Sequence, residues 1–273
     1  MLGEDDEVYS EVPEEVTVGE KTEGFPHESK YPLVVTLGLT LLGFGLAWPS
    51  PLFTVLVGAP VTLWGVGGWT LEYAVGDYED DVIPEQKRQL LGMESGTIAT
   101  WLFIVTEGLL FAGLFLSYFY LEADHGPWPP RGLPHLDFVY ALGLTAILIS
   151  SGVTLYIARR GLERGNRQTF NYGLAATIIL GLLFLAGQAY EYSQMVSEGL
   201  TPWAGAYGST FYLVTGTHGA HVVLGLVLLG VVGARAWLRG HFDENRHLFV
   251  KTASYYWHFV DAIWLLIMVF IYF

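Results

Sequence analysis

The sequence contains no cysteine in its 273 residues. A disulfide framework, a thiol nucleophile and a thiolate metal site are therefore excluded. Charged residues are also scarce, at 15%, whereas a soluble domain carries about a quarter. Apolar runs of about twenty residues take their place, long enough to cross a bilayer. Because these runs are continuous rather than alternating, they indicate helices and not a barrel. The sequence thus predicts an all-α polytopic membrane protein.

Motifs for nucleotide or peptide chemistry are absent as well. There is no Walker loop, no GxGxxG fingerprint and no HExxH pair. Interrupted spans do not recur in corresponding halves, as they do in many transporters. The residues alone indicate neither a catalytic site nor a metal site.

Negative charge is concentrated at the N-terminus. Residues 1–30 hold ten acidic side chains against two lysines, and so account for −8 of the formal charge of −14. Such a segment has too little apolar surface to fold alone, and we expect an acidic, disordered tail. Acidic loops and only four lysines in the whole chain also fit a halophilic source.

Seven membrane spans are predicted, in two groups. We expect them at about 31–48, 52–75, 96–121, 137–158, 170–195, 209–233 and 252–272. A long polar connection, 77–95, divides a two-helix hairpin (31–76) from a five-helix bundle (96–273). With the N-terminus inside, 12 of the 13 lysines and arginines fall in inside segments, and only Arg131 lies outside. The positive-inside rule therefore places the N-terminus inside and the C-terminus outside.

Glu107 lies inside the third span, eleven residues from its predicted start. A carboxylate in hydrocarbon costs about 2.5 kcal/mol or more. Glu107 is therefore protonated, paired, or turned towards protein. A proton-related or regulatory role is one interpretation, and a hydrogen bond that holds a neighbouring helix is the other.

Two histidines share a face of the sixth span, because His218 and His221 are three residues apart. Such a pair can ligate a metal, but a site needs further ligands, and no second histidine pair at helical spacing exists. The small residues around them favour contacts to backbone or carboxylate on a neighbouring helix.

His258 and Asp261 open the last predicted span and are also three residues apart. We expect an intrahelical contact that satisfies both near the interface, with a structural role. Glu191 lies near the outer end of its span and could pair with one of the histidines.

Several of these segments resemble one known family. The segments are Trp101–Phe115, Trp128–Pro130, Ser150–Val153, Tyr207–Val222 and Tyr255–Leu265. They are similar, in order, to subunit III of haem–copper cytochrome c oxidases. The likeness covers about residue 90 to the C-terminus, whereas residues 1–90 match by span count more than by motif.

The resemblance implies a seven-helix accessory subunit beside subunits I and II of a terminal oxidase, in the plasma membrane of a prokaryote. It implies no cofactor in this chain, with haem and copper in the partner subunits, and no nucleic-acid partner. Glu107 corresponds to the family's carbodiimide-reactive carboxylate. The family supports proton uptake and the stability of the catalytic subunit.

The resemblance also implies phospholipids in the cleft between the two helix groups. Arg235 matches a family arginine that meets a lipid phosphate. Trp69 matches a second lipid position, although the family's Trp-Arg-Asp reads Trp-Thr-Leu-Glu here. Two alternatives remain: a stand-alone proton or ion carrier that uses Glu107 and the two histidines as a relay, and the related subunit of a quinol oxidase or nitric oxide reductase.

Overall fold

The computed structural model describes residues 30–47, 51–75, 89–90, 93–134, 136–240, 242–243 and 247–273. For Arg239 and for parts of 42–56, 69–75 and 89–96 it describes the backbone only. The acidic tail 1–29 and most of the connection 77–95 lie outside these residues.

Seven α-helices make up almost all of the described chain. They are α1 Tyr31–Ala47, α2 Pro51–Val75, α3 Ser95–Asp124, α4 Phe138–Glu163, α5 Arg167–Ser197, α6 Gly205–Arg239 and α7 Leu248–Ile267. A π-helical turn, Met268–Tyr272, continues α7 to the end of the chain. Two short strands, β1 Gln89–Leu90 and β2 Met93–Glu94, pair in antiparallel fashion before α3. The predicted all-α fold with seven helices is confirmed.

Helices α3 to α6 are longer than the predicted spans, because apolar windows do not register capped helix ends. Asp137 Oδ1 accepts a hydrogen bond from the Tyr140 N–H at 3.0 Å and so begins α4. Asn166 caps α5 in the same way through the Thr169 N–H. Gly240, in the left-handed region at φ 62°, ends α6 six residues beyond the predicted span. Five of the described helices, α3 to α7, are long and apolar enough to cross a membrane.

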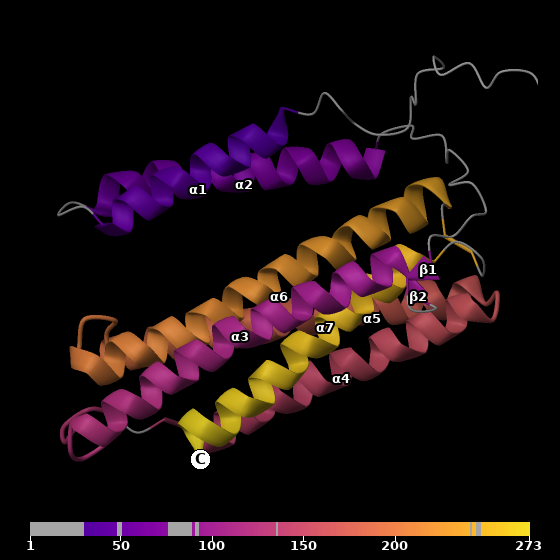
Figure 1. The fold of residues 1–273 in the computed structure, drawn as a ribbon. Coiled ribbons are helices and arrows are strands. Elements are labelled where there is room, and N and C mark those ends of the chain that lie inside the picture. Colours follow the sequence, from indigo (N-terminus) through magenta and orange to yellow (C-terminus); the bar gives the residue numbers. More distant parts are fainter. Residues whose placement is uncertain are drawn as a thin grey trace, which may run out of the picture.

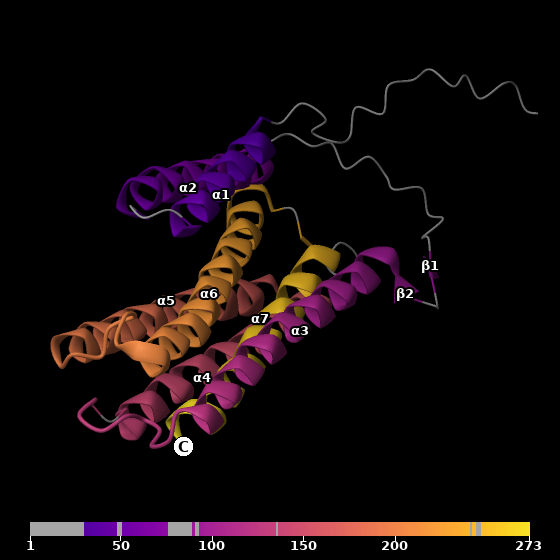
Figure 2. The same cartoon turned by 60° about the vertical axis from the view of Figure 1, so that its left-hand side comes forward.

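The helices form a bundle with a hairpin on one side (Figure 1). Helices α3 to α7 make up the bundle, whereas α1 and α2 pack against each other and α2 packs against α6. Turned by 60°, the view keeps the hairpin beside α6 and leaves α4 on the far side (Figure 2). Helix α7 packs against α3, α4 and α6.

Trp257 of α7 lies at the centre of the bundle and is fully buried. Its ring packs against Gly181 of α5 and Gly225 of α6, where a Cβ would lie 2.8 Å and 2.7 Å from ring carbons. Its indole N–H donates to Ser151 Oγ of α4 at 3.0 Å. A buried indole needs such a partner, and here one side chain joins four helices.

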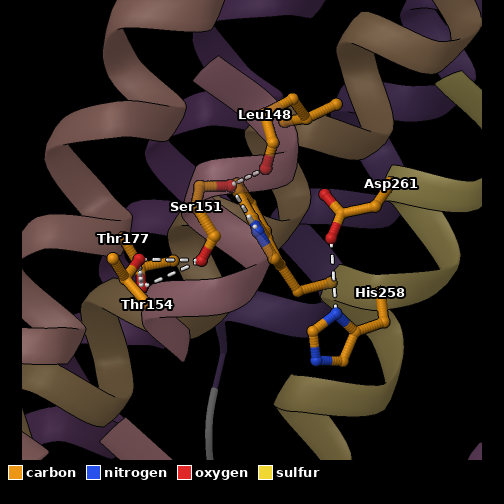
Figure 3. Close-up of polar contacts among 7 residues, drawn as sticks. Leu148, Ser151, Thr154, Thr177, His258 and Asp261 are labelled. Carbon is orange, nitrogen blue, oxygen red and sulfur yellow. Dashed lines mark hydrogen bonds and ion pairs between the residues drawn. The ribbon is translucent and has the colours of Figure 1, made fainter. Parts of the chain in front are cut away.

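Hydroxyl groups fasten α4 to its neighbours. Trp264 Nε1 donates to Thr145 Oγ1 at 2.9 Å, about 1.7 turns before Ser151 along α4. Nearly one turn after Ser151, Thr154 shares a hydrogen bond of 2.8 Å with Thr177 of α5 (Figure 3). These hydrogen bonds join α4 to α7 and to α5.

Candidate functional site

Glu107 of α3 contacts His221 of α6. Glu107 Oε2 and His221 Nε2 are 3.0 Å apart, and their side chains are 18% and 14% exposed. Glu107 lies ten residues after Thr97, where the apolar span begins, and so roughly 15 Å along the helix axis from that point. The predicted interhelical partner of the carboxyl group is thus a histidine 114 residues away in sequence.

The contact of His221 Nδ1 determines which ring nitrogen of His221 carries a hydrogen. His221 Nδ1 lies 2.8 Å from the carbonyl oxygen of Thr217, which can only accept a hydrogen bond. Nδ1 therefore carries hydrogen, and a neutral ring presents Nε2 as an acceptor. Glu107 then donates from a carboxylic acid, or else the pair is carboxylate and imidazolium. Both arrangements are electrically neutral overall and contain one shared proton.

Aromatic rings enclose the Glu107–His221 pair. The ring of Phe111, one turn after Glu107, meets the imidazole edge-on at 5.0 Å. The ring of Tyr256 of α7 stacks on the imidazole with ring centres 6.4 Å apart, and its hydroxyl donates to the His221 carbonyl at 3.4 Å. Sequence reasoning did not identify Tyr256 as a neighbour of this pair, because its contact with His221 depends on how α7 packs against α6.

His218 has a different environment from His221. It is 1% exposed and stacks on Trp264 at 5.2 Å, while Phe184 meets it edge-on at 5.9 Å. Neither ring nitrogen has a hydrogen-bond partner among the described residues. The two histidines therefore do not form one group with Glu107.

His258 and Asp261 make the predicted intrahelical contact, with Nδ1 and Oδ2 3.3 Å apart (Figure 3). The carboxyl group packs against Gly152 of α4. Helix α7 begins at Leu248, four residues before the predicted span, so ten helical residues precede His258. The predicted place of the pair near the interface stays a prediction.

Glu191 is paired with groups other than histidine. Its Oε2 accepts hydrogen bonds from Gln188 Nε2 and from the Tyr272 hydroxyl, both at 2.8 Å. Its Oε1 is buried without a partner in the part of the chain that the structure describes. Glu191 thus anchors the C-terminal π-helical turn to α5.

Of the two predicted lipid-binding residues, the structure describes the side chain of Arg235 but not that of Trp69. Arg235, on the last turns of α6, is 7% exposed and already has an interaction within the protein. The side chain of Trp69 on α2 lies outside the described residues. Within the described ranges, no group of three or more histidine, aspartate or glutamate side chains comes together as a possible metal site.

Comparison with known proteins identifies the family. The sequence model of cytochrome c oxidase subunit III matches residues 61–273. The chain belongs to the cytochrome c oxidase subunit III family. The predicted family and the function as subunit III of a haem–copper oxidase are thereby confirmed.

Bacterial and animal relatives are both similar to this subunit III. The cytochrome c oxidase subunit 3 of Corynebacterium diphtheriae is 38% identical over 203 residues, which are 73% of this chain and 98% of the relative. That of Oryctolagus cuniculus is 35% identical over 256 residues, 89% of this chain and 94% of the relative. That of Scyliorhinus canicula is 41% identical over 187 residues, 66% and 69% of the two chains. The chain is accordingly an integral membrane protein that associates with other oxidase subunits.

Proposed function

We propose that this subunit is a non-catalytic accessory that stabilises the catalytic subunit and supports its uptake of protons. Haem and copper would belong to the partner subunits I and II, and none would bind this chain. The observation that carries the proposal is the Glu107–His221 pair, because it uses the acid at membrane depth as a tie between two helices.

The geometry favours a shared, retained proton over one in transit. His221 Nδ1 is held by a backbone carbonyl, which cannot pass a proton on. Proton transfer through the ring would need that contact to break. Phe111 and Tyr256 meanwhile cover the ring on two sides. Glu107 therefore contributes to the packing of α3 against α6.

A stand-alone carrier finds less support. Its relay requires His218 to continue from His221, but the described contacts of His218 are to the rings of Trp264 and Phe184. A proton at His221 has no hydrogen-bonded route to His218 among the residues described.

Charge distribution supports the proposed orientation. The described basic residues around the α4–α5 turn, at the end of α6 and at the start of α7 lie at one end of the bundle, because adjacent helices are antiparallel (Figure 1). Arg131 lies in the connection at the other end. The basic end would face the cytoplasm, in the plasma membrane of a prokaryote. Phospholipids would lie between the hairpin and the bundle, with Arg235 near one phosphate and Trp69 near another.

Purification of the native assembly with Glu107 variants tests the proposal. The wild-type subunit should co-purify with a haem- and copper-containing partner, seen in the visible spectrum and the metal count. Glu107→Gln should retain nearly full turnover, since its amide N–H can donate to His221 Nε2. Glu107→Ala leaves that nitrogen unpaired and should lower subunit stability by about 1–3 kcal/mol.

The matched control is Glu198→Gln, at an exposed acid after α5. It should leave both turnover and stability unchanged. Immediate loss of turnover in Glu107→Gln would contradict the assigned role. A subunit that purified alone, moved charge in liposomes and carried no haem partner would contradict the proposed function itself.

A further inference from the structure

An open pocket of about 360 Å³ lies where α4 ends and α5 begins. We call it the α4–α5 pocket. Its walls come from the last turns of α4, the turn that follows and the first turn of α5, and include Tyr156, Ile157, Arg160, Arg164, Asn166 and Thr169. Two of the lining residues are arginines and none is acidic. Guanidinium groups bind phosphate and carboxylate groups through several hydrogen bonds at once, so the lining is suited to an anion.

A three-residue turn holds the walls of the α4–α5 pocket in place. Gly165 takes a left-handed conformation at φ 70°, and the Asn166 N–H donates to the Gly161 carbonyl at 2.8 Å. Beyond this turn α4 and α5 lie so close that a Cβ on Gly161 would be 2.8 Å from the Thr169 side chain. The lining side chains therefore extend from a backbone that packing and hydrogen bonds fix.

The lining residues have hydrogen-bond donors to spare. The Arg164 side chain has no hydrogen bond or ion pair within the described part of the chain. Asn166 Oδ1 accepts from the Thr169 N–H, which leaves the amide N–H groups of Asn166 without a partner among the described residues. Arg160 uses Nε on the Tyr156 hydroxyl at 3.2 Å, and a guanidinium has five N–H groups. The pocket thus presents donors and no carboxylate.

Positive charge exceeds negative charge around the α4–α5 pocket. Residues 156–169 contain four arginines and a single acid, Glu163. Glu163 contacts Arg159 at 3.0 Å and Arg160 at 3.7 Å, so one carboxylate is shared by two cations. The first turn of α5 contains no acidic residue either, and a helix N-terminus adds to the attraction for an anion. A ligand with negative charge therefore complements this surface.

The position of the pocket favours a lipid over a free anion. Tyr156 and Ile157 are 48% and 47% exposed, and they lie roughly 10 Å before the end of α4 along its axis. They give the pocket an apolar wall on the membrane side, where an acyl chain lies, and tyrosine is typical of the membrane interface. The hairpin packs against α6 and is on the other side of the bundle (Figures 1 and 2).

We propose that the α4–α5 pocket binds the headgroup phosphate of an acidic phospholipid. Arg160 and Arg164 contact the phosphate, the Asn166 amide donates to the headgroup, and an acyl chain lies against Ile157. An acidic lipid fits better than a zwitterionic one, because no lining carboxylate is present to pair with an amine. The site is separate from the lipid positions proposed at Arg235 and Trp69. It does not depend on the accessory role of the subunit.

Photoactivatable lipids test the ligand in membranes that contain the full chain. A phosphatidylglycerol probe with a diazirine on its acyl chain is compared with a phosphatidylcholine probe of the same chain at the same mole fraction. The acidic probe should label the segment around Ile157 several-fold more than the zwitterionic probe, as measured by mass spectrometry of peptides. The comparison segment surrounds Leu182, 54% exposed near the middle of α5, where the two probes should label equally. Equal labelling around Ile157 would overturn the proposal.

Substitution of Arg164 tests the charge. Arg164→Gln should lower labelling by the acidic probe about fivefold, the factor that corresponds to about 1 kcal/mol for one cation beside an anionic headgroup. Arg164→Lys keeps the charge and should retain most of the labelling. The matched control is Arg131→Gln, which removes an exposed arginine at the other end of the bundle and should change nothing. Labelling in Arg164→Gln that equals that of the wild type would contradict the contact with phosphate.

Inorganic phosphate distinguishes a lipid from a free anion. In excess and at constant ionic strength it should not displace the acidic probe, because the acyl chain also holds the lipid; displacement would overturn the lipid as ligand. A chain that misfolds in Arg164→Gln is missing from the membrane before the probe is added, and the comparison of the two probes on the wild type then decides. Co-purification with haem tests the proposed function separately, without any probe.

Discussion

His218 and His221 show how one turn of helix separates two chemical environments. Three residues along α6 rotate the side chain by about 60° around the axis, enough to send His218 onto Trp264 and His221 to Glu107. The first ring is used as an aromatic surface, and the second as a hydrogen-bonding group. Two histidines three residues apart on one helix can therefore have different roles.

Gly152 supports the His258–Asp261 pair from α4. A Cβ at this position would press on the Asp261 carboxyl group and lie 3.4 Å from His258 Nδ1. Gly152→Ala should therefore push the carboxyl group aside, with a destabilisation of about 1–3 kcal/mol from overpacking. A thermal-stability measurement on the purified oxidase, resolved by subunit, checks this.

Gly143, on the same helix, provides the control. A Cβ there meets nothing within 4 Å, and alanine is the better helix former by up to about 1 kcal/mol. Gly143→Ala should thus be neutral or slightly stabilising. Equal melting temperatures for the two variants would show that the Asp261 carboxyl group can move aside without loss of stability.

Sequence alone picked out the polar residues but could not pair them. Glu107 and His221 are both conspicuous in apolar surroundings, yet their contact depends on how α3 packs against α6. The sequence left the partner of Glu191 undetermined. Its hydrogen bond from Tyr272 depends on how the π-helical turn packs against α5. Local spacing determined only the His258–Asp261 contact, because both residues are on one helix.

At the scale of elements, α7 is held to α4 by two indole–hydroxyl bonds. Trp257 donates to Ser151, and Trp264 donates to Thr145. A buried tryptophan can be expected from sequence to need a hydrogen-bond acceptor. The sequence does not predict which hydroxyl of α4 provides it. The helix bounds were predicted within a few residues, except at the C-terminal ends of α4 and α6, which lie five and six residues beyond the predicted spans.

Ser151 and Ser150 provide a matched test of this attachment. Ser151→Ala leaves the buried Trp257 N–H without an acceptor and should cost about 1–3 kcal/mol. Ser150 is exposed and bonds to the Ala146 carbonyl of its own helix at 2.7 Å. Ser150→Ala should change the unfolding temperature of the subunit little. The same subunit-resolved thermal assay compares them, and equal losses would mean that the indole bond contributes nothing.

At the scale of the molecule, the hairpin depends on the bundle for packing more than the bundle depends on the hairpin. The bundle has its own core around Trp257, whereas the described attachment of the hairpin is through α2 to α6. The family model matches residues 61–273, which contain the whole bundle and only the later part of α2.

Deletion of residues 1–76 tests the division. The remaining five helices should still insert and co-purify with haem-containing subunits, because the bundle keeps its own core around Trp257. Phospholipid phosphorus per oxidase should fall, since one wall of the proposed lipid cleft is gone. Deletion of residues 1–28 alone is the control and should preserve the lipid content. Loss of co-purification in the 1–76 deletion would contradict the independence of the bundle.

The tie between Glu107 and His221 also bears on chemical labelling of this subunit. The two groups meet at 3.0 Å with aromatic rings beside them, and the Glu107 side chain is 18% exposed. A carbodiimide product on Glu107 would act as a wedge between α3 and α6, whatever the acid does with protons. Inhibition after such labelling would then report a spread bundle, and a blocked proton path would need separate proof.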